Sequence, residues 1–219
     1  MFIEDGYIKD DDGRTLLLRG INEGGSSKVP RDPDGASYRM RGFFDHTTVS
    51  FVGRPFPLAE ADEHFMRLKT WGLIFIRLIV TWEAIEHQGP GKYDNDFLDY
   101  MEELVDRADK YGIKIIIDPH QDVWSRWTGG DGAPGWTLEI VGIDPTKLHP
   151  SGAALVHNQY EKTYPKMIWP TNYTRFGAAT MFTLFFGGNV FAPFTRIGTV
   201  PVQEFLQNHY INAYKVLAQ

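Results

Sequence analysis

Apolar residues that recur at intervals of three and four predict two helices in the first half of the chain. The first covers Leu58–Trp71, and Gly72 can end it in the left-handed conformation that other residues avoid. The second begins at Asp94 or Asn95, either of which can cap a helix, and ends before Gly112. The apolar stripes consist of Leu58, Ala61, Phe65, Leu68 and Trp71 in the first helix and of Phe97, Tyr100, Met101, Leu104, Ala108 and Tyr111 in the second.

Each predicted helix leads directly into a short apolar run that predicts a strand. The runs are Leu73–Val80 and Ile113–Asp118, and the second is mostly β-branched, which is typical of a strand buried on both faces. The glycines before them, Gly72 and Gly112, lie 40 residues apart (112 − 72 = 40). That period is the size of one β/α unit, so the pattern predicts an α/β fold with parallel strands.

The segment before the first helix is predicted as a hairpin, a strand and a long loop. Residues 2–14 form the N-terminal hairpin, with Asp5-Gly6 as its turn, and Thr15–Ile21 is the first strong strand. Asn22–Pro57 is polar and rich in Gly, Ser, Asp and Pro. It is too long for an ordinary connection, so we expect a functional loop or an ordered excursion.

Residues 124–199 interrupt the β/α rhythm, and we interpret them as an insertion over the mouth of the fold. Within this insertion Tyr173–Phe186 is apolar and helix-like, and its core is about half of the roughly 20 residues that span a bilayer. We expect this helix to pack on the body of the protein; the alternative is a surface that makes peripheral contact with a membrane. Val200–Ala218 is predicted as a final helix.

The final predicted helix has no strand after it. Three parallel strands beside an open edge would leave apolar faces and unpaired backbone exposed. A closed (β/α)8 TIM barrel takes about 250 residues or more. We therefore expect residues 1–219 to form an incomplete TIM-barrel domain, the N-terminal part of a larger barrel with about three β/α units. The alternative is that another chain completes the barrel.

Composition narrows the classes of function. The 219 residues include no cysteine, which excludes disulfides, thiolate metal sites and a cysteine nucleophile. The net charge is −6 and no basic face is apparent, so nucleic acid is not an expected partner. The first residues lack the basic start and apolar run of a signal peptide, and we expect a cytoplasmic protein. In that compartment the glycosylation sequon at Asn172 would go unused.

Polar side chains gather just past the strand Ile113–Asp118, where α/β folds usually place their chemistry. Asp118, His120 and Asp122 can accept or donate hydrogen bonds to hydroxyl groups. Trp124 is expected to bind substrate by stacking on a sugar ring, with packing in the core as the alternative. Trp127 and Trp136 offer the same two possibilities.

Two basic residues precede that cluster in the chain. Lys28 follows the first strand and is either a donor to sugar hydroxyls or phosphate, or a solvated surface residue. Arg77 lies within an apolar strand and must find acceptors there, either a catalytic carboxylate or an ion-pair partner such as Asp118.

Two further interpretations of the acidic residues are open. Glycoside hydrolysis needs two carboxyl groups about 5–9.5 Å apart, and Glu83 with Asp122 or Asp118 is the pair that the strand ends offer. A structural role for Glu83 is the alternative. His120 and Asp122 are too few ligands to predict a metal site.

Three ordered motifs resemble glycoside hydrolase family 5 enzymes that act on glycolipids. Leu18-Arg19-Gly20-Ile21-Asn22 with Lys28-Val29-Pro30 is similar to the first-strand motif. Ile76-Arg77 with residues 81–86 and the continuation 89–94 is similar to the second. Asp118–Arg126 is similar to the third, and the resemblance is nearest to endoglycoceramidase relatives of the fungal glucosylceramidase and steryl β-glucosidase branch.

The resemblance implies a (β/α)8 barrel and a retaining mechanism with two glutamates and no cofactor. In that family one glutamate follows an asparagine at the fourth strand and the other ends the seventh, so both are expected beyond Gln219. Carried over residue by residue, the resemblance assigns sugar contacts to Lys28, His120 and Asp122 and support of the nucleophile to Arg77. The positions of Glu83 and Glu86 are not those of the catalytic pair.

The resulting prediction is the glycone-binding half of a retaining β-glucosidase whose substrate is a glycolipid, glucosylceramide or a steryl β-glucoside. The 219-residue chain alone is expected to be inactive, with the C-terminal half of the barrel as its missing partner. A non-catalytic carbohydrate- or lipid-binding remnant is the alternative of a different class.

Overall fold

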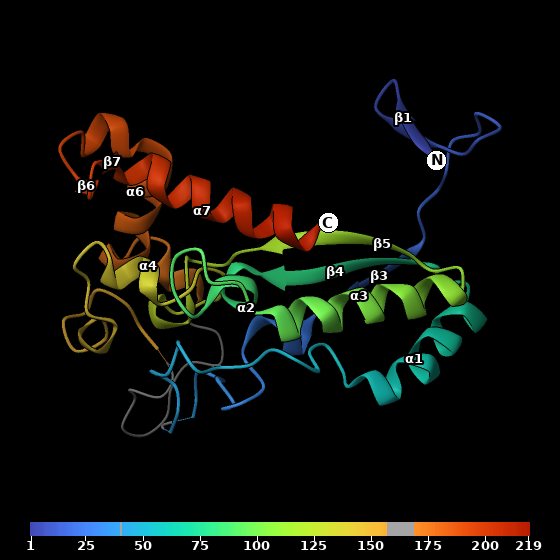
Figure 1. The fold of residues 1–219 in the computed structure, drawn as a ribbon, viewed down its shortest axis with the longest axis horizontal. Coiled ribbons are helices and arrows are strands. Elements are labelled where there is room, and N and C mark those ends of the chain that lie inside the picture. The colour runs from blue at the N-terminus through green and yellow to red at the C-terminus, as the bar shows by residue number, and fades with distance from the viewer. Residues whose placement is uncertain (40, 157–168) are drawn as a thin grey trace.

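The computed structural model describes residues 1–39, 41–156 and 169–219, and its centre is a parallel sheet of three strands (Figure 1). The strands are β3 (Gly20–Glu23), β4 (Phe75–Thr81) and β5 (Lys114–His120), in the order β3-β4-β5. Ile21 pairs with Ile76, which pairs with Ile115. The parallel arrangement predicted from the repeated β/α pattern is therefore confirmed, and all three strands end at the same edge.

Two helices, α1 (Leu58–Thr70) and α3 (Asn95–Lys110), cover one face of this sheet (Figure 1). Each lies within two residues of its predicted bounds. Asp94 caps α3 by accepting a hydrogen bond from the backbone N–H of Phe97 at 3.0 Å, as predicted. The two helices pack on the sheet through a core that includes Phe65, Ile76, Leu78, Leu104 and Ile115.

The predicted first strand over Thr15–Ile21 is wrong in its position. Strand β3 begins only at Gly20, and the preceding residues run as an exposed connection to the hairpin, with Leu17 82% exposed. A Cβ atom on Gly20 would lie 1.6 Å from the carbonyl oxygen of Phe75. Glycine is thus required at the position where β3 first approaches β4.

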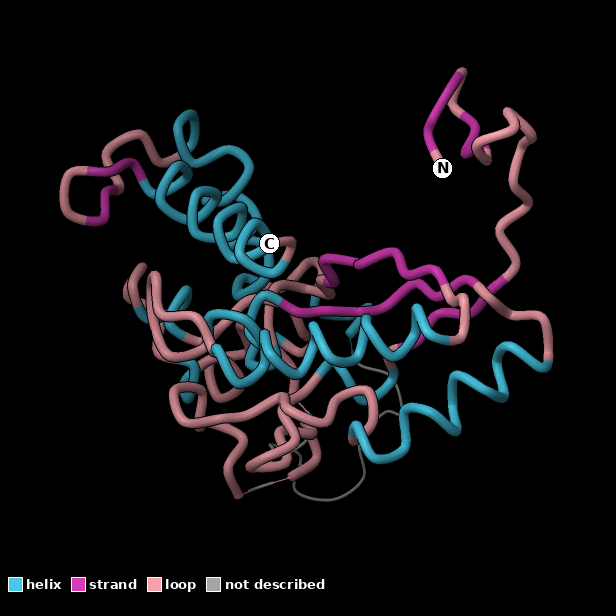
Figure 2. The backbone as a smooth tube through the Cα atoms, turned by 45° about the vertical axis from the view of Figure 1, so that its right-hand side comes forward, coloured by secondary structure: helices cyan, strands magenta, loops and turns pink. Residues whose placement is uncertain are grey.

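The N-terminal hairpin is confirmed and projects away from the sheet (Figures 1 and 2). Strands β1 (Phe2–Glu4) and β2 (Tyr7–Lys9) pair antiparallel. Asp5 and Gly6 both have positive φ, which matches the two-residue turn that favours this pair of residues.

The segment from Thr81 to Tyr93, which connects β4 to α3, contains a short helix. Helix α2 (Trp82–Glu86) starts directly at the end of β4, and the side chain of Thr81 caps it by accepting from the N–H of Ala84 at 3.3 Å. Five residues give too little periodicity to predict such a helix from the sequence.

The remaining described elements are short, apart from two helices near the C-terminal end of the chain. Three short turns of 3-10 helix span Gly25–Lys28, Arg126–Thr128 and Pro145–Lys147, and the short helices α4 and α5 span Trp136–Glu139 and Trp169–Asn172. Helix α6 (Phe176–Phe191) and helix α7 (Val202–Leu217) are joined by the two-residue strands β6 (Arg196–Ile197) and β7 (Val200–Pro201). Part of the predicted insertion, residues 157–168, lies outside the described residues.

Helices α6 and α7 pack against each other, and α7 then runs back to the end of the sheet (Figures 1 and 2). The hydroxyl of Tyr214 donates to the carbonyl of Val80 at 2.9 Å, and the ring of His209 lies 2.8 Å from Glu86. The predicted final helix is confirmed within two residues. None of the described helices combines the length and the apolar character that crossing a bilayer requires.

The side chain of Asn172 is buried and holds a backbone segment. Its Oδ1 accepts from the N–H of Leu155 at 2.7 Å and its Nδ2 donates to the carbonyl of Leu155 at 3.0 Å. Because this amide is fully buried, a glycan on its Nδ2 atom could not be accommodated without displacing the packed segment around Leu155.

Replacing Tyr214 by Phe should weaken the attachment of α7 to β4. The change removes one hydrogen bond and leaves the carbonyl of Val80 without it, so we expect a loss of about 1–2 kcal/mol in the free energy of unfolding, measured with urea. Tyr7→Phe, on the projecting hairpin, is the matched control and should change nothing. Equal stability of the two variants would contradict the role of this contact.

Candidate functional site

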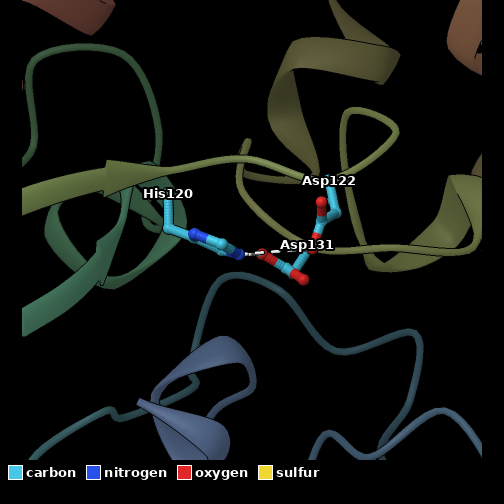
Figure 3. A group of neighbouring side chains, drawn as sticks. All are labelled: His120, Asp122 and Asp131. Atoms are coloured by element: carbon cyan, nitrogen blue, oxygen red, sulfur yellow. Dashed lines mark hydrogen bonds and ion pairs between the residues drawn. The ribbon is translucent and has the colours of Figure 1, made fainter. Parts of the chain in front are cut away.

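Lys28, His120, Asp122 and Asp131 meet at the carboxyl ends of β3 and β5, and Figure 3 shows the last three of these side chains. The ammonium of Lys28 lies 2.6 Å from Asp122 and 3.4 Å from Asp131. The Nε2 atom of His120 lies 3.2 Å from Asp122 and 3.7 Å from Asp131. The structure therefore brings together Lys28, His120 and Asp122, three residues that the sequence proposed from separate segments.

Asp131 belongs to this cluster and was missed from the sequence. It follows two glycines in a loop that turns back on the end of β5, and it bridges to Asp122 through backbone hydrogen bonds of 3.1 and 2.9 Å. A Cβ on Gly130 would lie 1.9 Å from the carbonyl oxygen of Asp122, so the close approach needs glycine. The signal available in the sequence was an acid inside a glycine-rich turn, which is equally typical of an exposed loop.

Burial and neighbouring charges shift the pKa values of Asp122 and Asp131 in opposite directions. Burial raises the pKa of Asp131 to about 6, although Lys28 and His120 act in the opposite direction. For Asp122 burial is outweighed by the hydrogen bond and charge of Lys28, so its pKa lies below the ordinary value. The pKa of Lys28 is raised, because Asp122 and Asp131 outweigh the effect of its burial.

A second chain of contacts links Arg77 to the cluster. The guanidinium of Arg77 lies 2.7 Å from Asp118, and the other ring nitrogen of His120, Nδ1, lies 2.8 Å from the same carboxylate. The predicted ion pair between Arg77 and Asp118 is thus present, but Arg77 is 44% exposed in its side chain rather than buried. Its assignment as support for a nucleophile stays a prediction.

Trp124 does not lie where a sugar could stack on it. Trp124 is only 2% exposed, and its indole N–H donates to the hydroxyl of Thr137 at 3.0 Å. Its ring packs against Trp82, Phe182 and Phe185. The core-packing alternative fits this burial and the stacking prediction does not. The same holds for Trp127 and Trp136, which are also buried.

Glu83 is fully buried and belongs to a structural ion pair. Both of its oxygens accept hydrogen bonds from Arg126, at 2.7–3.1 Å. Glu86 is buried as well and accepts from the indole N–H of Trp82 at 2.6 Å. Neither glutamate is free to meet a substrate, so the pairing of Glu83 with Asp122 as catalytic acids is wrong.

His120, Asp122 and Asp131 are close enough to hold a metal ion, since one ligand atom from each lies within 4.8 Å of the others. The ammonium of Lys28, however, already contacts both carboxylates. A second cation beside it would meet charge repulsion, so we interpret the group as an ion-pair cluster that presents hydrogen-bonding groups.

Comparison with known proteins identifies the family to which the chain belongs. The model of the cellulase family, glycosyl hydrolase family 5, matches residues 32–175. The chain belongs to glycosyl hydrolase family 5. The fold is correspondingly the N-terminal portion of a (β/α)8 barrel, as predicted from the unclosed sheet.

Members of this family from fungi are similar over nearly the whole chain. A glucosylceramidase of Rhizopus delemar is 52% identical over 97% of the chain, and an ergosteryl-beta-glucosidase of Saccharomyces cerevisiae is 42% identical over 97%. The sterylglucosidase 1 structure of Cryptococcus neoformans superposes with a TM-score of 0.91 at 40% identity over 97% of the chain. The chain spans about a third of the length of these relatives: 32%, 30% and 31%.

Replacing Glu83 by Gln should destabilise this family 5 fold severely. The change leaves the buried guanidinium of Arg126 without its counter-charge, and we expect a loss of about 3–5 kcal/mol in the free energy of unfolding. Glu63→Gln is the matched control, because Glu63 pairs with Arg67 on the exposed surface of α1, and it should cost no more than about 0.5 kcal/mol. Urea unfolding measures both variants, and equal losses would contradict a structural role for the buried pair.

Proposed function

We propose that this chain supplies the sugar-binding side of a glycosidase that acts on a β-glucoside carried by a lipid. The observation that carries the proposal is the convergence of Lys28, His120 and Asp122 at the ends of β3 and β5, the edge where (β/α)8 enzymes bind substrate. The relatives named glucosylceramidase and ergosteryl-beta-glucosidase support a glucosylceramide or steryl glucoside as its substrate.

The chemistry of the cluster suits a neutral sugar. Asp122 is ionised and can accept from hydroxyl groups, Lys28 can donate, and His120 can do either. All three are partly exposed, so a ligand can reach them. The glutamates that cleave the bond belong to strands that the described part of the chain does not contain.

Substitution of the cluster should weaken sugar binding. We expect Lys28→Met and Asp122→Asn each to raise the Kd of methyl β-D-glucoside about tenfold or more, because each removes a charge-assisted hydrogen bond of about 1.5–3 kcal/mol. Titration calorimetry or saturation-transfer NMR on the 219-residue chain measures this. Lys147→Met and Asp144→Asn, from an exposed ion pair of 3.4 Å, are the matched controls and should not change the Kd.

The same preparations test the reaction. We expect no release of 4-methylumbelliferone from its β-glucoside by the chain itself. Turnover that disappears in Glu83→Gln, with the fold retained, would contradict the proposal and restore the catalytic role of Glu83. Unchanged Kd in both cluster variants would remove the sugar site.

We propose further that α6 and the following turn contact the membrane in which a lipid glycoside resides. Tyr173, Phe176 and Phe186 are exposed, as a peripheral membrane contact through Tyr173–Phe186 requires. The exposed apolar surface continues past that segment through Val190, Phe191 and Phe194, of which Phe194 is 92% exposed. Helix α6 carries no charged residue, and aromatic side chains of this kind insert into the headgroup region.

Replacing Phe186 and Phe194 together by Asp should reduce binding to vesicles. We expect at least a tenfold loss in co-sedimentation affinity for phosphatidylcholine vesicles that contain glucosylceramide, since burying each phenyl ring in lipid contributes about 1.5–3 kcal/mol. Phe185 is unsuitable for this test, because it packs against Trp124 and Tyr210. Leu17→Asp, an equally exposed position on the opposite side of the fold, is the control; equal binding of both variants would remove this proposal.

A further inference from the structure

Asp131 is the most buried member of the charged cluster, and its position is set by the backbone rather than by its side chain. The residue is 4% exposed, and the two hydrogen bonds to the backbone of Asp122 hold it against the end of β5. Its Oδ1 atom has no hydrogen-bond partner among the described residues. A buried carboxylate oxygen without a hydrogen bond destabilises the folded state unless nearby positive charges compensate it.

The groups that face Asp131 come from four elements. Lys28 comes from the turn after β3, His120 from the end of β5 and Asp122 from the loop that follows. Tyr214 of α7 also feels its charge, but burial keeps the pKa of this phenol well above its ordinary value, so it stays neutral. The compensation of Asp131 therefore falls to Lys28 and His120.

The same contacts fix the two groups that were assigned to the sugar. Lysine has a long side chain with several rotatable bonds, and holding it in one place costs entropy. Asp122 gives the ammonium one ion-pair contact, at 2.6 Å. Asp131 gives it a second, at 3.4 Å, from a different segment of the chain. His120 is likewise flanked by Asp122 and Asp131 on its Nε2 side and by Asp118 on its Nδ1 side.

We propose that Asp131 is a positioning residue: it holds the ammonium of Lys28 and the imidazole of His120 in place for the sugar without touching the sugar itself. The sugar part of this inference rests on the proposed function. The electrostatic part does not, because it concerns contacts within the chain. At neutral pH Asp131 carries a negative charge, and it becomes neutral as the pH falls through about 6.

The variant Asp131→Asn tests, without any ligand, whether the carboxylate of Asp131 restrains the ammonium of Lys28. The rate at which acetic acid N-hydroxysuccinimide ester modifies Lys28 at pH 8 is measured by peptide mass spectrometry, with Lys147 as the internal reference. Loss of the carboxylate lowers the pKa of Lys28 and frees its amine, so we expect modification about threefold faster or more. Asp106→Asn, an exposed acid on α3, is the control variant and should leave the rate unchanged. An unchanged rate at Lys28 in Asp131→Asn would overturn the inference.

Lys28→Met tests the same coupling from the other side and does not depend on the folding of the Asp131 variant. Carbon-13 NMR of the aspartate carboxyl groups reports the titration of Asp131. Because Lys28 acts to lower the pKa of Asp131, its removal should move the midpoint upward from about 6. A midpoint that stays in place would overturn the inference.

The affinity for methyl β-D-glucoside then separates the two proposals. We expect Asp131→Asn to weaken binding several-fold at pH 7.5 and much less at pH 5, where the native carboxyl is already neutral. A loss that is the same at both pH values would overturn positioning by charge. Absence of binding by the unmodified chain would overturn the proposed function, while the two ligand-free measurements would still decide the role of Asp131.

Discussion

The structure depends on Arg126, a buried guanidinium that joins three distant parts of the chain. It pairs with Glu83 of α2, and it donates to the carbonyls of Phe43 at 3.0 Å and Asp45 at 3.1 Å in the long loop. Arg126 is only 1% exposed, and its positive charge is tolerated there because these acceptors surround it. The part of the loop around Phe43 and Asp45 is thereby joined to the core, and Trp127, which follows Arg126 in the chain, also donates its indole N–H to the carbonyl of Phe43.

This ordered loop gives the site its geometry. The register of the sheet determines where β3 and β5 end. Lys28 follows β3 and lies over those ends, so that its ammonium contacts Asp122, 94 residues later in the chain. The glycine turn around Gly130 brings in Asp131 from the opposite direction. These segments contact Arg126 or are hydrogen-bonded to one another, so the polar side chains of the site are already held in position without a ligand. Such preorganisation lowers the entropic cost of binding.

The sequence predicted the regular elements well, because periodicity reports which face of an element is buried. It placed α1, α3 and α7 within two residues of their ends and found Lys28, His120 and Asp122. It misplaced β3, since the steric need for Gly20 beside Phe75 is a tertiary property. It assigned Trp124 to the substrate although this residue is buried, left the role of Glu83 open and missed Asp131. Burial in an irregular segment is decided by partners far away in the chain and leaves no periodic signal.

The balance of charge in the cluster fits the neutral sugar that we propose as its ligand. Lys28 and Arg77 contribute two positive charges, and Asp118, Asp122 and Asp131 contribute three negative ones when all are ionised. These five groups sum to −1 when all are ionised, and the sum rises toward zero as Asp131 binds a proton below about pH 6. A neutral glycoside gains little from net charge but much from donors and acceptors fixed in direction, whereas a phosphate would need an excess of positive charge. These five charged groups thus give the site many directed hydrogen-bonding groups with a small net charge.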